Sequence, residues 1–467
     1  MKQLWLILIF LFPCGVSGMP QDSLLLLSKD ELLSIVREYH PVVKQADLSV
    51  ERSEAAVTAA RGGFDPKLAA GMERKTLDRE FYYSYFHPNI SIPTWYGLEL
   101  KAGAEEIAGN RVSRERTLGT TSYAGVRWSV TQGLLFDERR ATLRQAQTLV
   151  QLSEAERQQQ VNTILYEALS AYWLWVKQYN YYNIYTNAVA LNKQRLMMVK
   201  AEFEQGNRPA IDTVEALTQL QVYQLLQSEA QMEFRNAGYD LSNYLWLEGN
   251  QPAMLGDNII PDTTNISLYT EMQELPSLEE LVVQALNNHP KLRMAAFKID
   301  YYDIERRLKA QYLVPKLDIN ANLLNKRYEL PAELTVPFME NNYKLGIDFS
   351  MPLLFRKAKG EYKQARIQQQ EANIERDYTA LQVENKIKSY YNEVLTLKKQ
   401  IELYENANEN YSRMLTGELA RYRIGESNLF LVNSRENKLL EASRKLFELK
   451  TKWHKSYAGM LWAAGIM

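Results

Sequence analysis

Few side chains in this 467-residue sequence have the chemistry of a catalytic or metal site. The chain has one cysteine, Cys14, and four histidines, His40, His87, His289 and His454. This inventory excludes a Cys-based metal site, a disulfide framework and a Cys/His catalytic pair. Carboxylate or Ser/Lys catalysis stays open, but no carboxylate pair, nucleophile elbow or phosphate-binding loop stands out. We therefore expect a protein that is not an enzyme and that has no cofactor and no metal.

Charge and hydropathy narrow the class of protein further. The 55 basic and 56 acidic side chains give a net charge of −1. A nucleic-acid partner is not expected, because binding to phosphates needs a surplus of Lys and Arg. The mean hydropathy of −0.38 excludes a polytopic helical membrane protein. Because 46% of the residues are hydrophobic, a disordered chain is excluded as well.

The first 18 residues are typical of a secretory signal peptide. Lys2 precedes an apolar run from Leu4 to Phe12, and the small residues 16–18 follow as a cleavage site. The run is too short to span a bilayer, which takes about 20 apolar residues. A competing interpretation makes Cys14 a lipid acceptor, but residues 11–13 lack the small residue that such a site needs before the cysteine.

The remaining chain is a tandem duplication. Three pairs of similar segments lie 249 residues apart: 28–32 and 277–281, 40–41 and 289–290, 65–68 and 314–317. Further on, Leu135-Phe136 matches Leu354-Phe355 at an offset of 219. The difference, 249 − 219 = 30, is an insertion in the first copy between Pro66 and Phe136. Repeats of this length define the organisation of the whole chain.

Each repeat begins with a helix and continues into strands. Ser28 and Ser277 are N-cap residues, and a glutamate three residues later is typical of a capping box. Pro66 and Pro315 are expected as the breaks between helix and strand. Alternating apolar and polar residues then predict strands over about 67–130 and about 316–350.

Long helical hairpins follow the strands, over about 137–247 and about 356–465. No Pro or Gly interrupts 137–205, so this stretch predicts one helix of roughly 100 Å. Apolar residues recur at alternating steps of three and four, the period of a coiled coil. Gln178, Asn192 and Asn408 are the polar exceptions on this seam. Gly206 and Gly425 are expected to end the first helix of each hairpin.

Neither repeat can bury its apolar faces alone, which favours symmetric assembly around an axis. The sequence resembles the TolC family of outer-membrane channels over its whole mature length. The resemblance depends on the duplicated plan, on prolines 41 and 290, on residues 64–68, 133–136, 140–146 and 352–355, and on the glycine turns.

This resemblance implies a mainly α fold with a small membrane β part. It implies a homotrimer with a trimeric α-helical periplasmic barrel and a 12-stranded outer-membrane β-barrel, four strands per protomer. The organisation is then a signal peptide (1–18), a first repeat (19–247), a linker or equatorial region (248–275) and a second repeat (276–467). The protein would lie in a Gram-negative outer membrane, in contact with its lipid, and extend into the periplasm.

The function implied by the resemblance is a passive exit duct. It would conduct drugs, small molecules or secreted proteins out of the periplasm, as part of a tripartite efflux or type I secretion system. A periplasmic adaptor (membrane fusion) protein and an inner-membrane pump would be its partners. Two alternatives from other classes are a periplasmic coiled-coil adaptor or scaffold without a pore, and a structural trimer that does not transport.

The resemblance also implies a pore constriction. Acidic residues six and nine positions after a tip glycine line the entrance in relatives, and Asp212 and Glu215 match them after Gly206. Leu431 and Ser434 stand at these positions after Gly425, so the second repeat departs from the pattern. Three-fold symmetry would make rings of carboxylates that select cations. Alternatively, the two acids stabilise the start of a helix through its dipole.

The glycine turns are expected at the periplasmic tips, where the family's adaptor docks. The residues assigned to this contact are Gly206, Asn207, Arg208, Pro209, Gly425, Glu426 and Ser427. Arg421 and Arg423, together with Arg208, are expected to form salt bridges between the tips, or alternatively to be solvated surface residues. The aromatic residues 81–86 and 95–96 of the insertion suit a membrane interface or a packed loop.

Overall fold

The computed structural model describes residues 25–112, 116–256, 258–262, 275–326 and 342–467. The expected signal peptide and Cys14 lie outside these residues, as do parts of the expected linker and of the second strand region. The described chain is mainly helical, which confirms that part of the predicted fold class. Within the same residues, no helix is both long enough and apolar enough to cross a membrane.

Each repeat opens with two helices separated by a His-Pro step. The first repeat has α1 (Lys29–Tyr39) and α2 (Pro41–Arg61), and the second has α6 (Leu278–Asn288) and α7 (Pro290–Gln311). Ser28 and Ser277 cap α1 and α6 by accepting the amides of Glu31 and Glu280, each at 3.2 Å. The two predicted N-caps are therefore confirmed.

Prolines follow the ends of α2 and α7. Pro66 lies between the 3-10 helix η1 (Gly62–Phe64) and β2, and Pro315 lies between α7 and β9. After the strands, the chain enters the long helix α3 at a turn held by Arg140. This buried guanidinium donates to three carbonyls of the turn, those of residues 133–135, and to the carboxylate of Asp137.

Two helical hairpins follow. The first consists of α3 (Glu138–Glu204) and α4 (Ala210–Ser242), and the second of α8 (Arg356–Arg423) and α9 (Leu429–Ala464). The α3 stretch lacks both Pro and Gly, and α8 has glycine only at 360 and 417. No residue in either helix removes a backbone donor as proline would, so each continues without a break.

Six strands form one antiparallel sheet, in the order β10-β9-β5-β4-β3-β2. Its strands are β2 (Lys67–Leu77), β3 (Glu80–Pro93), β4 (Leu98–Ala108), β5 (Gly119–Ser129), β9 (Lys316–Lys326) and β10 (Tyr343–Ser350). Two small sheets pair β1 (Leu25–Leu27) with β8 (Ile259–Pro261) and β6 (Trp246–Leu247) with β7 (Gln251–Pro252).

The expected four strands per protomer are therefore wrong for the described sheet, which has six. The insertion in the first repeat accounts for the two extra strands. It folds as β3 and β4, which pair with each other and lie between β2 and β5 in the sheet. Asp78 and Arg79, with φ of 52° and 65°, form the two-residue turn from β2 to β3. Positive φ at both central residues is the geometry of a tight hairpin turn.

The large sheet has one apolar face and one polar face. Ile92, Leu100, Val126, Ala321 and Leu345 are cross-strand partners in a continuous row. The next residue along each strand points to the opposite face, so Ser91, Lys101, Gly125, Asn322 and Lys344 form a parallel polar row. The apolar face is open in the isolated chain, with Leu345 60% exposed.

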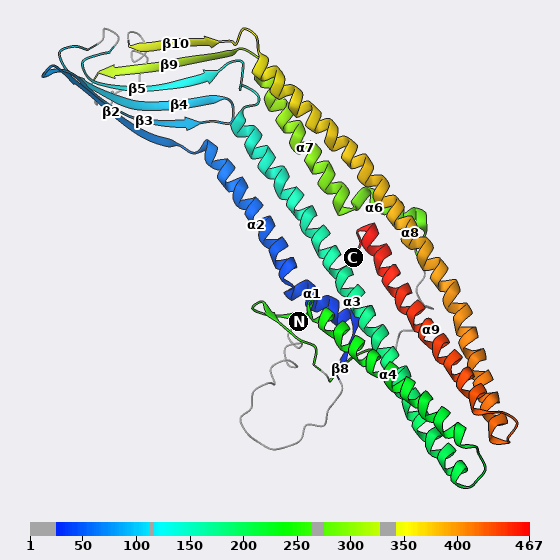
Figure 1. Cartoon of the computed structure of the whole chain (residues 1–467). Coiled ribbons are helices and arrows are strands. Elements are labelled where there is room, and N and C mark those ends of the chain that lie inside the picture. The colour runs from blue at the N-terminus through cyan, green and yellow to red at the C-terminus, as the bar shows by residue number, and fades with distance from the viewer. Residues whose placement is uncertain (1–24, 113–115, 257, 263–274, 327–341) are drawn as a thin grey trace, which may run out of the picture. The chain divides into compact units, whose positions relative to one another are not determined.

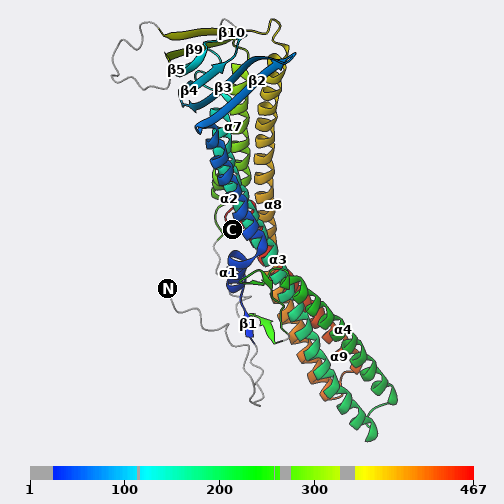
Figure 2. The ribbon, with the colours of Figure 1, turned by 90° about the vertical axis from the view of Figure 1, so that its left-hand side faces the viewer.

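The chain forms two compact units, and each unit contains parts of both repeats. Unit 1 comprises residues 1–40, 165–275 and 391–459, and unit 2 comprises 41–164, 276–390 and 460–467. Unit 2 contains the large sheet and the helices that lead away from it (Figure 1). Unit 1 contains a bundle of four helical segments from α3, α4, α8 and α9 (Figure 2).

Candidate functional site

The end of the unit 1 bundle carries both glycine turns (Figures 1 and 2). Gly206 has φ of 75° and Gly425 has φ of 79°, a conformation that glycine adopts without strain. At the first turn, the amide of Gly206 donates to Phe203 and that of Asn207 donates to Glu202, each at 2.9 Å. The second turn repeats both bonds, and this pair defines a Schellman motif. The predicted helix ends are therefore confirmed.

The returning helix α4 begins directly after Pro209. Pro209 has extended backbone angles and is the N-cap, so the first helical residue is Ala210. Asp212 lies in the first turn of α4, where its charge is favourable to the helix dipole. This position agrees with the alternative interpretation of Asp212 from the sequence.

Arg208 joins the first turn to the second hairpin. Its guanidinium donates to Glu202 at 2.7 Å and to Asp212 at 3.5 Å. The same group lies 4.1 Å from the ring centroid of Tyr422, which is on α8. Burial acts to lower the pKa of Arg208, but the hydrogen bond to Glu202 and the nearby acidic groups outweigh it and raise that pKa overall. Asp212 thus shares its counter-ion, Arg208, with Glu202.

A buried polar cluster lies behind the turns. Arg195 of α3 makes a two-pronged ion pair with Glu436 of α9, at 2.6 and 3.2 Å. Asn192 donates to the same carboxylate at 3.1 Å, and the Tyr223 hydroxyl donates to it at 3.4 Å. Burial and the charge of Glu436 raise the pKa of Tyr223, so this hydroxyl stays protonated and keeps donating.

Glu215 also contacts the second hairpin. Its carboxylate accepts a hydrogen bond from the side-chain amide of Asn433 at 3.0 Å, which joins α4 to α9. One turn further, Gln219 and Tyr223 of α4 both donate to Asn437, at 3.1 and 2.7 Å. The two hairpins are therefore held together by polar contacts along one face of α4.

The second turn has its own polar contacts. Arg421 approaches Glu426 of the same turn, with Nε and Oε2 3.9 Å apart. Ser427 donates to the buried Glu418 at 2.5 Å. Arg423 is exposed and forms no ion pair within the described part of the chain.

The structure thus brings together some of the residues expected at the tips. Arg208, Asp212 and Glu215 lie at the junction of the two hairpins, whereas Arg421 binds within its own turn. Sequence reasoning missed Arg195, Glu436 and Tyr223, which form the most buried contacts of this site. The signal for them was Asn192, a polar residue on an otherwise apolar seam.

The contacts of this site join the two helical hairpins. Apart from Arg423, the arginines named here each face a carboxylate: Arg195 faces Glu436, Arg208 faces Glu202 and Asp212, and Arg421 faces Glu426. Among the described residues, no group of three or more His, Cys, Asp or Glu side chains could hold a metal ion. The arrangement can hold two helix ends together, and it can release them when a pair is broken.

A six-stranded sheet joined to two duplicated helical hairpins defines a class of protein, and comparison with known proteins identifies that class. Residues 281–465 match the model of the outer membrane efflux protein family. This match covers most of the second repeat, and it confirms the resemblance to TolC-type channels seen in the residues. No curated protein sequence gives a significant match.

Solved outer-membrane channels share the fold over nearly the whole chain. CmeC of Campylobacter jejuni is 13% identical with a TM-score of 0.65, over 94% of this chain and 85% of that one. VceC of Vibrio cholerae is 14% identical with a TM-score of 0.64, over 94% and 96% of the two chains. MtrE of Neisseria gonorrhoeae is 13% identical with a TM-score of 0.65, over 94% and 88%.

Proposed function

We propose that this protein is an outer-membrane efflux channel that acts as the passive exit duct of a tripartite efflux or type I secretion system. Three copies would assemble around an axis, with their sheets closing one barrel in the outer membrane. Each copy would supply its six strands to this barrel in place of the four first expected. The helices would form the periplasmic tunnel, and an adaptor and an inner-membrane pump would deliver the cargo.

The two-faced sheet carries this proposal. Its apolar face bears large exposed side chains on strands from both repeats: Leu68, Met72, Leu100, Val126, Trp128, Leu345, Ile347 and Phe349. Such a face is unfavourable in water, since each exposed apolar Å² costs about 25 cal/mol. The opposite face has charged pairs, among them Arg127 with Asp318 at 2.8 Å. Lipid on one side and water on the other would satisfy both faces.

The same feature argues against the scaffold alternative. A sheet with an open apolar face is unfavourable in a soluble periplasmic coiled-coil protein, because large exposed apolar patches promote association with other molecules. A structural trimer without transport would keep both faces, so only a transport measurement separates it from a channel.

Two adjacent substitutions on β9 test the proposal. Leu323 faces the apolar side and its neighbour Asn322 the polar side. Leu323→Lys would place a charge in lipid, at a cost of roughly 2–4 kcal/mol near the midplane, and should reduce the trimer recovered from outer membranes. Asn322→Lys adds the same charge and should assemble normally.

Planar-bilayer recordings of the purified wild-type protein should then show discrete conductance steps. The membrane assignment would be contradicted if both lysine variants gave equally little trimer in the outer membrane. It would also be contradicted if the wild-type protein were recovered in the soluble fraction without detergent. Normal membrane trimers without conductance would favour the structural trimer.

We further propose that Asp212 and Glu215 form the carboxylate rings at the entrance. In the trimer, the Asp212 carboxylate would contact Arg208 and would also contribute negative potential to the lumen. Replacing both acids by Ala should lower cation selectivity and weaken block by multivalent cations, because the negative potential at the constriction falls. Unchanged reversal potentials in asymmetric salt would leave the acids with a helix-capping role only. Glu409→Ala, on the exposed surface of α8, is a control.

A further inference from the structure

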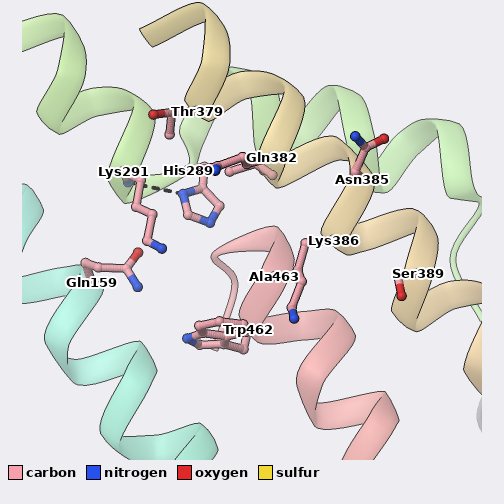
Figure 3. A pocket seen from close by; sticks show the side chains of 11 residues that line it. Gln159, His289, Lys291, Thr379, Gln382, Asn385, Lys386, Ser389, Trp462 and Ala463 are labelled. Atoms are coloured by element: carbon pink, nitrogen blue, oxygen red, sulfur yellow. Dashed lines mark hydrogen bonds between the residues drawn. The ribbon is translucent and has the colours of Figure 1, made fainter. Parts of the chain in front are cut away.

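A cavity of about 490 Å³ lies within unit 2. It is open to solvent and is lined by residues of the α6–α7 junction, of α8 and of the C-terminal end of α9, with Gln159 of α3 at one side (Figure 3). This volume is in the range of small-molecule sites, roughly 300–1,000 Å³.

The wall of the cavity is fixed by buried hydrogen bonds. The Nδ1 atom of His289 accepts the backbone amide of Lys291 at 3.1 Å, and its imidazole also bonds to the carbonyl of Ala463. Burial and the charge of Lys291 lower the pKa of His289 to about 4, so the ring is neutral near pH 7. The indole N–H of Trp462 donates to Thr163 at 3.2 Å, which fixes the orientation of this ring.

The charge of the cavity is entirely positive. Lys291 and Lys386 line it from two different helices, and no Asp or Glu is among the lining residues. Lys291 Nζ lies 5.9 Å from the Trp462 ring centroid (Figure 3), and Lys386 Nζ lies 5.1 Å from the ring centroid of Tyr390 on its own helix. Within the described part of the chain, neither lysine forms an ion pair. The remaining polar groups are neutral amides and hydroxyls.

The first repeat provides an internal comparison. At the offsets of 249 and 219, the positions of Lys291 and Lys386 are Val42 and Glu167. In the first repeat His40 meets Trp246 edge-on at 6.2 Å, and in the second repeat His289 and Trp462 both line the cavity. The first repeat therefore builds the same junction with neither lysine. The two cations are therefore not needed for the helix break.

We propose that this cavity binds a small organic anion, namely a carboxylate on a planar aromatic ring. The ring stacks on Trp462 beside Val383, and the carboxylate lies between Lys291 and Lys386. Aromatic stacking supplies the apolar contact, and charge-assisted hydrogen bonds supply the selectivity for an anion. The site is separate from the proposed export function, since no step of the proposed transport uses these residues.

Calorimetric titration of the purified full-length protein in detergent tests the proposal. The probe is 1-naphthoate, and its neutral analogue 1-naphthamide is the ligand control. Naphthoate should bind at one site per chain and at least tenfold more tightly than the amide, because only the carboxylate pairs with the lysines. Its affinity should fall as salt rises, since both lysines are exposed to solvent.

Two variants take their residues from the first repeat. Lys291→Val and Lys386→Glu should each weaken naphthoate binding at least tenfold and leave the weak amide binding unchanged. Lys399→Glu makes the same charge change on an exposed face of α8 outside the cavity, and it should bind like the wild type.

Three results would overturn the proposal. The first is equal affinity for the acid and the amide, and the second is equal weakening by Lys399→Glu and Lys386→Glu. The third is absence of naphthoate binding together with a less heat-stable oligomer for Lys386→Glu. That last combination would mean that a carboxylate of a neighbouring copy occupies the cavity.

Discussion

Removing the carboxylate of Glu436 gives the sharpest test of how the two helical hairpins are joined. In Glu436→Ala, the Arg195 guanidinium loses both of its short hydrogen bonds, and the amide of Asn192 loses its bond to the same carboxylate. The Arg195 side chain is only 12% exposed, so water cannot replace these partners. The variant therefore leaves a charge buried without a counter-ion.

The expected cost follows from this burial. Breaking one side of a buried ion pair costs about 3–5 kcal/mol, mostly through the charge that remains. Replacing both partners by apolar residues, as in Arg195→Met with Glu436→Leu, removes that charge and should recover most of the loss. The exposed pair of Arg413 and Glu409 on α8 is the control, and Glu409→Ala should cost less than about 1 kcal/mol.

Hydrogen exchange on the full-length protein measures the effect locally. Amides in 188–199 and 429–442 should exchange roughly two to three and a half powers of ten faster in Glu436→Ala, since each 1.4 kcal/mol is a factor of ten. Protection should return in the double variant. The reasoning would be refuted by a loss of protection under tenfold, or by a double variant as poorly protected as the single one.

Two further predictions concern the His-Pro step and the second turn. The pKa of His289 is about 4 in the folded state, below its ordinary 6.5, so the unfolded state binds more protons between these values. The free energy of unfolding should therefore fall by up to about 3 kcal/mol as pH drops from 6.5 to 4. His289→Asn keeps an N-cap acceptor and should flatten that dependence in pH-resolved thermal melts; an unchanged slope would contradict this origin. Gly425→Ala should destabilise the tip by about 1–2 kcal/mol because of its positive φ, whereas Gly417→Ala, inside α8, should stabilise it by up to about 1 kcal/mol. Denaturant melts that give both changes the same sign would disprove the backbone argument.

The helices were predictable because their signals are local. Ser28 and Ser277 mark helix starts by a side chain that accepts a nearby amide, and Gly206 and Gly425 mark helix ends by a conformation that other residues avoid. Each of these signals operates within about five residues. The corresponding contacts in the structure lie at those positions.

The sheet was harder to predict because strand pairing is not local. The sequence of the insertion is rich in aromatic residues, and it does not predict that the segment lies between β2 and β5 in the sheet. Its two strands become evident only from the partners, such as Ile90 with Ala102. The number of strands was therefore underestimated, although alternating residues predicted strands over about 67–130 and about 316–350.

The buried ion pair at the tips was missed for a related reason. Arg195 and Glu436 are separated by 241 residues, and each alone resembles an ordinary charged residue on a helix surface. Only the packing of α3 against α9 makes them partners. Asn192 signalled an interruption of the apolar seam, but its own sequence context does not identify the group that it contacts.

The two His-Pro junctions of this chain can be compared with each other within a single protein. The two junctions arose from one duplicated segment. Because they are parts of the same polypeptide, they are always present in equal amounts and under the same conditions. Val42 and Glu167 record one outcome of that divergence, and Lys291 and Lys386 record the other. Exchanging residues between the two junctions therefore compares the effects of the same side chains at two related positions. The rest of the protein is identical in both cases, which is not true when proteins from different organisms are compared.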